Sequence, residues 1–118
     1  MKTGSLYAIP YKGGYLAFKV FAVTLTDEAS IIHITLYAAL FDSPEEVAVT
    51  RETPLFLAHL PIREEFLAPH ATLVSEGDVY SDEEQIYKNW LAEWNEGLAS
   101  ICSIPLGALL DELISAKG

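Results

Sequence analysis

Cysteine is nearly absent from this sequence, because Cys102 is the only one among 118 residues. A single thiol cannot close an internal disulfide, and it rules out zinc motifs built on several cysteines. Cys102 lies in an apolar run that includes Leu98 and Ile101, so we expect it to be a small buried hydrophobic residue. Hydrophobic residues make up 51% of the chain. We therefore expect one domain, residues 1–118, that folds on its own core.

Basic residues are also scarce. Seven Lys and Arg face 17 Asp and Glu, which gives a formal net charge of −10. Nucleic-acid binding depends on Lys and Arg that neutralise phosphates, and anionic membrane surfaces attract the same residues, so we expect neither partner. Two interpretations of the acidity remain, a basic protein partner or simple solubility.

Long apolar runs are missing as well. The longest apolar-rich stretch, residues 15–25, contains Lys19 and is too short to span a bilayer. The first residues, Met1-Lys-Thr-Gly-Ser, carry no apolar segment of the kind found in secretory signals. These observations favour a cytoplasmic location.

Sequence signatures of catalysis and of metal binding are missing too. No Gly-x-Ser-x-Gly elbow, phosphate loop or dinucleotide fingerprint is present. His33, His59 and His70 have no metal-ligand spacing, and the first two lie in apolar segments, which predicts hydrogen-bonded core or cross-strand residues. Adjacent acids such as Glu83 and Glu84 point in different directions on a helix or a strand, so they make poor acid–base pairs. We predict no catalytic residue, no metal and no cofactor.

The first two thirds of the chain carry the patterns of strands. Apolar, β-branched and aromatic residues fill five segments separated by turn residues, with paired glycines at Gly13-Gly14 favouring a hairpin. Both faces of the second segment are apolar, so we expect both to be covered. The predicted strands are residues 6–11, 15–26, 31–41, 55–60 and a shorter one at 71–75.

The last third predicts helices. Ser81 opens a capping box with Glu84, and apolar residues recur at helical spacing until Gly97 ends the pattern. That stripe contains Ile86, Tyr87, Trp90, Leu91 and Trp94, and we expect it to pack on the sheet. A second helix is predicted over residues 105–116. The fold class is α+β, an N-terminal antiparallel meander of four or five strands with C-terminal helices, with a curled sheet or a partial barrel both open.

The opening of the chain resembles the immunity protein 26 family of small bacterial proteins thought to neutralise toxins of polymorphic toxin systems. The resemblance rests on Gly4-Ser-Leu-Tyr-Ala-Ile-Pro10, then Gly13-Gly14-Tyr15, then Ala17-Phe18 and Val20. It covers residues 4–20 and, loosely, the strand that ends at Phe41. Lys19 departs from the small residue common in that family, and the family's later Trp-containing strand has no equivalent here. The resemblance implies stoichiometric binding of a toxin without catalysis.

The leading hypothesis is therefore a non-catalytic protein-binding module, an immunity-type inhibitor that neutralises a toxin or other basic partner by stoichiometric binding. Acids on the predicted 82–96 helix are the candidate binding residues, and each is expected outside the core: Asp82, Glu83, Glu84, Glu93 and Glu96. One alternative is a small-molecule-binding or enzymatic domain with a pocket between the sheet and the Trp90/Trp94 helix. Another is a homo-oligomer that buries apolar strand faces.

Overall fold

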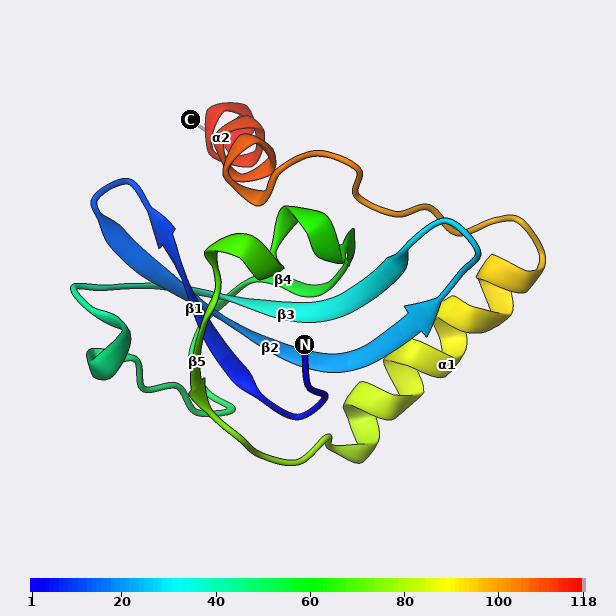
Figure 1. Cartoon of the computed structure of the whole chain (residues 1–118), viewed down its shortest axis with the longest axis horizontal. Helices are drawn as coiled ribbons and strands as arrows, with labels where there is room; N and C mark the ends of the chain where they lie inside the picture. Colours follow the sequence, from blue (N-terminus) through cyan, green and yellow to red (C-terminus); the bar gives the residue numbers. More distant parts are fainter. Residues whose placement is uncertain (118) are drawn as a thin grey trace.

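The computed structural model describes the backbone of residues 1–117 and the side chains of residues 1–112. Five strands form one antiparallel sheet in the order β4-β3-β2-β1-β5, and the sheet does not close into a barrel (Figure 1). Their bounds are β1 Leu6–Tyr11, β2 Gly14–Leu25, β3 Ser30–Phe41, β4 Leu55–Arg63 and β5 Thr72–Ser75. The predicted α+β class, with its meander first and its helices last, is confirmed.

The turn between β1 and β2 differs from the prediction by one residue. Tyr11 pairs with Gly14, so the two-residue turn consists of Lys12 and Gly13, which both have positive φ angles, 47° and 81°. Two successive positive φ values are typical of the hairpin turn whose twist matches that of the strands. Gly14 is already part of β2, where a Cβ atom would lie 2.9 Å from the Leu40 side chain of β3.

Both predicted helices are present. α1 runs from Ser81 to Asn95 and α2 from Leu106 to Lys117, while short 3₁₀ turns occupy Pro44–Glu46 (η1), Glu64–Phe66 (η2) and Ala68–His70 (η3). The fourth strand continues through Pro61 to Arg63, beyond its predicted end at residue 60. Proline is tolerated there because β4 is an edge strand, and the free Pro61 carbonyl accepts a hydrogen bond from the Cys102 N–H at 2.7 Å. Cys102 is half-buried, not fully buried as expected.

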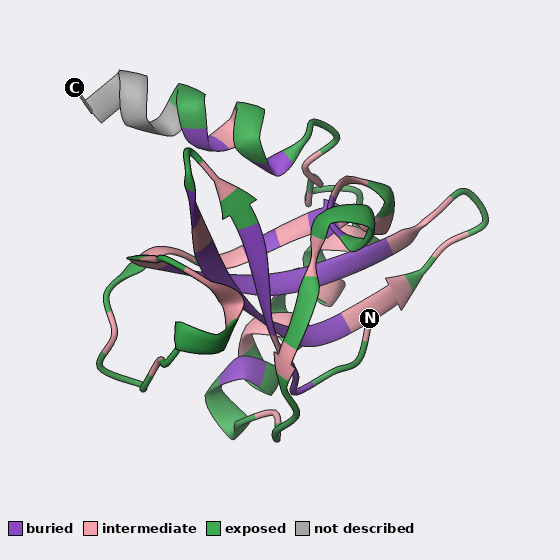
Figure 2. Ribbon diagram, turned by 60° about the vertical axis from the view of Figure 1, so that its left-hand side comes forward, coloured by how far each residue is buried: buried purple, intermediate pink, exposed green. Residues whose placement is uncertain are grey.

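One face of the sheet carries the main core. Phe18, Ile34 and Leu36 are fully buried on it, and they are covered by Leu67 from the η2–η3 connection and by Leu110 of α2. The β4–β5 connection, which contains η2 and η3, crosses the sheet from one edge to the other and places β5 beside β1 (Figure 1). The purple strand interiors in Figure 2 mark the buried centre of the sheet.

The other face of the sheet carries α1 and part of the β3–β4 connection, residues 42–54. His33, which alternates with the core residues of β3, packs against Trp90 of α1 with ring centroids 4.5 Å apart. Both faces of β2 are thus covered, as its composition predicted. No helix within residues 1–117 is long and apolar enough to cross a membrane.

Candidate functional site

The α1 side of the sheet is polar in its interior. Lys19 of β2 and Glu83 of α1 are 7% and 8% exposed, and Lys19 Nζ donates a hydrogen bond to Glu83 Oε1 at 2.8 Å. The same carboxylate oxygen accepts a hydrogen bond from the Tyr80 backbone N–H, also at 2.8 Å. The pair therefore joins the start of α1 to the centre of the sheet. Buried charges survive only with such partners, because an unpaired one loses its hydration without compensation.

This geometry corrects two predictions about the start of α1. Glu83 was expected on the surface as a partner-binding acid, but it is buried and paired with Lys19. Ser81 was expected to cap the helix, but it is the first helical residue, Tyr80 is the N-cap, and Glu83 closes the box. The sequence allows two capping boxes one residue apart, Ser81 with Glu84 or Tyr80 with Glu83. The structure has the box of Tyr80 and Glu83, because the ion pair with the buried Lys19 fixes the position of Glu83.

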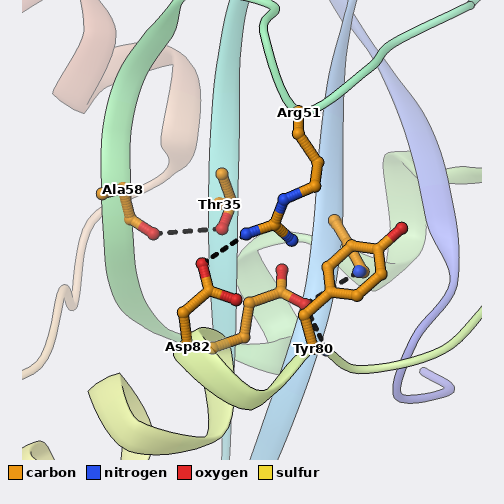
Figure 3. Close-up of polar contacts among 7 residues, drawn as sticks. Thr35, Arg51, Ala58, Tyr80 and Asp82 are labelled. Atoms are coloured by element: carbon orange, nitrogen blue, oxygen red, sulfur yellow. Dashed lines mark hydrogen bonds and ion pairs between the residues drawn. The ribbon is translucent and has the colours of Figure 1, made fainter.

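Arg51, Tyr80 and Asp82 form the entrance to this polar interior (Figure 3). Arg51 extends from the β3–β4 connection, its Nη2 lies 2.6 Å from Asp82 Oδ2, and its Cζ lies 4.3 Å from the centroid of the Tyr80 ring. Lys19 Nζ also contacts that ring, at 3.8 Å from the centroid. The hydrogen bond from Arg51 lowers the pKa of Asp82, and the bond to Asp82 raises the pKa of Arg51. Asp82 is exposed as predicted, but its charge is neutralised by Arg51.

Two cavities meet at this entrance. One, of about 140 Å³, lies between the sheet and the start of α1 and is lined by Thr35, Tyr37 and Glu83 together with the apolar side chains of β4. The other, of about 180 Å³, lies beside Lys19 and the turn that precedes α1. Tyr37, Arg51 and Tyr80 line both. Burial and then the Glu83 carboxylate raise the pKa of Tyr37, so its phenol is protonated at neutral pH.

Further along α1 the interior is filled by rings. His33 Nδ1 and His59 Nε2 lie 2.9 Å apart, and His33 Nε2 lies 2.9 Å from the Thr24 hydroxyl, which reaches Tyr87 at 3.0 Å. His33 and His59 are thus the hydrogen-bonded cross-strand residues that the sequence predicted. Burial lowers the pKa of His33 to about 3, with a contribution from His59, and burial also lowers the pKa of His59.

Trp90 is buried as predicted, with 7% of its surface exposed, and it stacks on the half-buried Trp94 at 5.2 Å between centroids. Rings therefore occupy the space next to Trp90 that was considered for a ligand pocket. A cavity of about 320 Å³ does touch Trp94, but it opens toward the β2–β3 turn, at Asp27 and Glu28, and toward Ile101.

The remaining predicted acids lie at both ends of α1, Glu84 in its first turn and Glu93 and Glu96 at its other end. Glu84, Glu93 and Glu96 are exposed, and none forms an ion pair with the side chains that the structure describes. Gly97, at a φ of 76°, ends the helix. Its N–H and that of Leu98 donate to the Trp94 and Glu93 carbonyls at 3.0 and 2.9 Å, the arrangement of a Schellman motif. Leu98 stands 73% exposed beside these acids.

Sequence reasoning missed the members of the entrance that lie far apart in the chain. Arg51 and Tyr80 sit in segments without periodicity, and nothing local connects them to Asp82. Lys19 offered the one available indication, since a lysine in a strand that is apolar on both faces needs a buried acid. The resemblance also singled out this position, as a departure from the family pattern.

Among residues 1–112, no three or more His, Cys, Asp or Glu side chains are grouped so that they could hold a metal ion. The arrangement instead offers hydroxyl and carboxylate oxygens beside aromatic rings, which suits hydrogen bonding and the binding of cations. Comparisons of the chain with protein-family models, with curated proteins and with solved structures gave no match.

Proposed function

We propose that this chain is a non-catalytic protein-binding module that neutralises a basic partner, most simply a toxin domain in the same cytoplasm, by stoichiometric binding. The observation that carries the proposal is the position of Glu93 and Glu96. Both are exposed at the C-terminal end of α1, and the last turn of this helix contains no basic residue. The resemblance of residues 4–20 to immunity proteins supports the same function.

Acids at the C-terminal end of α1 do not stabilise the helix. The C-terminus of a helix carries a partial negative charge, so carboxylates there cost stability, whereas Asp82 and Glu84 at the N-terminus favour it. Solubility requires surface charge but does not require it at an unfavourable position. Binding a basic surface does explain this placement, because carboxylates around the exposed Leu98 would meet cations while the leucine is buried.

The charge balance of the folded chain supports this proposal. Among the described side chains, the ion pairs use only Glu64, Glu65, Glu76, Asp82, Glu83 and Asp111 of the 17 acids. The surplus carboxylates create a negative potential over the surface. Such a potential accelerates the encounter with a basic protein and disfavours acidic ones.

The test uses the product of the adjacent gene as the candidate partner. Co-expression of this chain should relieve the growth inhibition that the partner causes, and the two should form a complex of fixed stoichiometry in light scattering. The double variant Glu93→Gln/Glu96→Gln should slow association by roughly two- to tenfold at low salt, with a smaller change in dissociation.

The control is Glu45→Gln/Glu46→Gln, which removes the same charge from the exposed turn η1. This variant should leave association within about twofold of the parent if the surface at the end of α1 makes the contact. Equal effects of the two double variants would show a general charge effect without a specific surface. A neighbour that forms no complex with the chain would count against the immunity role.

A second candidate function is small-molecule binding at the cavities around Arg51 and Tyr80. The convergence of Thr35, Tyr37 and Glu83 favours it, because ligand sites combine apolar walls with a few polar groups. The size of the cavities disfavours a whole metabolite, since each of the two, of about 140 and 180 Å³, is below the roughly 300 Å³ of common ligand pockets. A metabolite that raises the Tm of the parent but not of Tyr37→Phe would support this function.

A further inference from the structure

The cavity between the sheet and the start of α1 has more hydrogen-bond acceptors than donors. Glu83 uses Oε1 for Lys19 and for the Tyr80 N–H, and its Oε2 has no partner among the described residues. The Thr35 hydroxyl donates to the Ala58 carbonyl at 3.0 Å, which leaves its lone pairs available. Tyr37 is more than nine-tenths buried, and its hydroxyl makes no hydrogen bond within residues 1–112. A donor-rich group would satisfy these oxygens.

The protein already holds a guanidinium at the entrance to this cavity. Arg51 is bound by the Asp82 carboxylate and by the face of the Tyr80 ring (Figure 3). A carboxylate beside an aromatic face is a combination that recognises cations. Arg51 and Asp82 are more than half exposed, so the pair is solvated and easily exchanged. Arg51 thus covers the cavity without filling it.

We propose that this cavity receives an arginine side chain of the basic partner, and that Arg51 occupies the entrance until that arginine displaces it. The inference rests on the proposed function, whose partner is basic. Arginine fits better than lysine because its planar guanidinium carries five donors and stacks on aromatic rings. The unfilled oxygens of Thr35, Tyr37 and Glu83 surround the cavity on several sides, and Tyr80 offers the ring.

An anion is the competing occupant, because Arg51 could serve as its anchor. The charges around the cavity disfavour it. Asp82 and Glu83 flank the space, and both local cations, Arg51 and Lys19, are already paired with them. An incoming anion that bound Arg51 would leave the Asp82 carboxylate unpaired, whereas an incoming cation displaces Arg51 and pairs with Asp82 in its place.

The experiment titrates the full chain with Nα-acetyl-arginine amide and follows backbone amide shifts by NMR. We expect saturable shifts near Thr35, Glu83 and Asp82, with a Kd of about millimolar, as a ligand of this size permits. Arg51→Ala should tighten binding by up to about fivefold, because it removes the competitor. Asp82→Asn should weaken binding in the parent background. The citrulline analogue, which has the same shape without the charge, should not bind.

Lys12→Ala is the matched control. It removes a cation from another exposed ion pair, Lys12–Asp111, whose side chains are 60% and 59% exposed. This variant should leave the Kd of the arginine probe unchanged. Loss of binding of the arginine probe in Arg51→Ala would overturn the proposal. Saturable shifts at Arg51 with acetate in place of the arginine probe would overturn it in favour of an anion site.

The outcome separates this inference from the function it rests on. Saturable shifts of Thr35, Glu83 and Asp82 with the arginine probe report on the cavity, which Glu93 and Glu96 do not line. No saturable shift in either the parent or the folded Arg51→Ala variant would reject the arginine site. Partner binding that still depends on Glu93 and Glu96 would then leave the proposed function intact.

Discussion

At the scale of single residues, the sequence predicted apolar burial well and polar burial poorly. Trp90 and His33 are buried as their neighbours indicated. Glu83 was misplaced because an acid in the first turn of a helix is fully explained by the helix dipole. Its actual partner, Lys19, lies 64 residues away. Such a pair depends on how α1 docks on β2, and local spacing does not encode that docking.

The histidine pair makes folding stability sensitive to pH. Burial lowers the pKa of His33 from its ordinary value of 6.5 to about 3 and also lowers that of His59. Below pH 6.5 these two histidines bind protons in the unfolded chain but remain largely unprotonated in the folded chain. The free energy of unfolding therefore falls as pH falls. The expected slope approaches about 1.4 kcal/mol per pH unit for each fully shifted histidine.

Urea denaturation between pH 7.5 and 5 measures this slope, because ordinary carboxyl groups remain largely ionised in that range. The control is His70→Gln, which removes an exposed histidine of η3 and should leave the slope unchanged. His59→Gln should reduce it. A free energy of unfolding that stays constant over this range would mean that the two rings take up protons without leaving their positions.

At the scale of elements, strand and helix bounds follow the sequence within a few residues, and the details that differ have physical causes. β4 continues through Pro61 because an edge strand tolerates the missing N–H. The hairpin places its positive φ angles at Lys12 and Gly13 because Gly14 must pair with Tyr11 and pack closely against Leu40. Sequence patterns identify the turn, and the pairing and packing of the strands determine which residues form it.

Three substitutions in α1 test its revised description. Ser81→Ala should change the free energy of unfolding by less than about 0.5 kcal/mol, because Tyr80 is the N-cap and Glu83, not Ser81, contributes the side-chain hydrogen bond of the capping box. Trp90→Ala should cost about 3–5 kcal/mol, because the ring is buried against His33. Trp90→Phe should cost less, since it keeps a ring and removes an indole N–H that has no partner among the described residues. Urea denaturation with Trp94 as the fluorescent reporter measures all three, and a large effect of Ser81→Ala would restore it as the cap.

At the scale of the whole molecule, the strand order could not be predicted beyond the meander. Pairing of β1, β2, β3 and β4 follows from short connections, because consecutive strands usually lie side by side. β5 instead crosses the sheet to pair with β1, over a connection that contributes the buried Leu67 to the core. The net charge likewise follows from the sequence, but the positions of the charges in the fold do not. Asp82 and Glu83 at the start of α1 are paired with Arg51 and Lys19, whereas Glu93 and Glu96 at its end form no ion pair with the described side chains.

This arrangement predicts opposite effects of salt on stability and on binding. Ion pairs are fewer than the surplus carboxylates, so self-repulsion among the latter dominates the long-range electrostatics of the folded chain. Raising NaCl from about 0.01 to 0.1 M shortens the Debye length from about 30 to 10 Å and should raise the free energy of unfolding. The same change should slow association with a basic partner.

Urea denaturation and stopped-flow association across this NaCl series measure the two effects. Chloride is the appropriate anion, because sulfate strengthens apolar burial and would stabilise the fold for another reason. The variant Glu93→Gln/Glu96→Gln should show a smaller salt dependence in both measurements, since it removes two of the repelling charges. A free energy of unfolding that falls with salt would show that the ion pairs, including Arg51–Asp82, outweigh the repulsion. Stability and association that rise together with salt would argue against a basic partner, because screening slows the association of oppositely charged proteins and speeds that of like-charged ones.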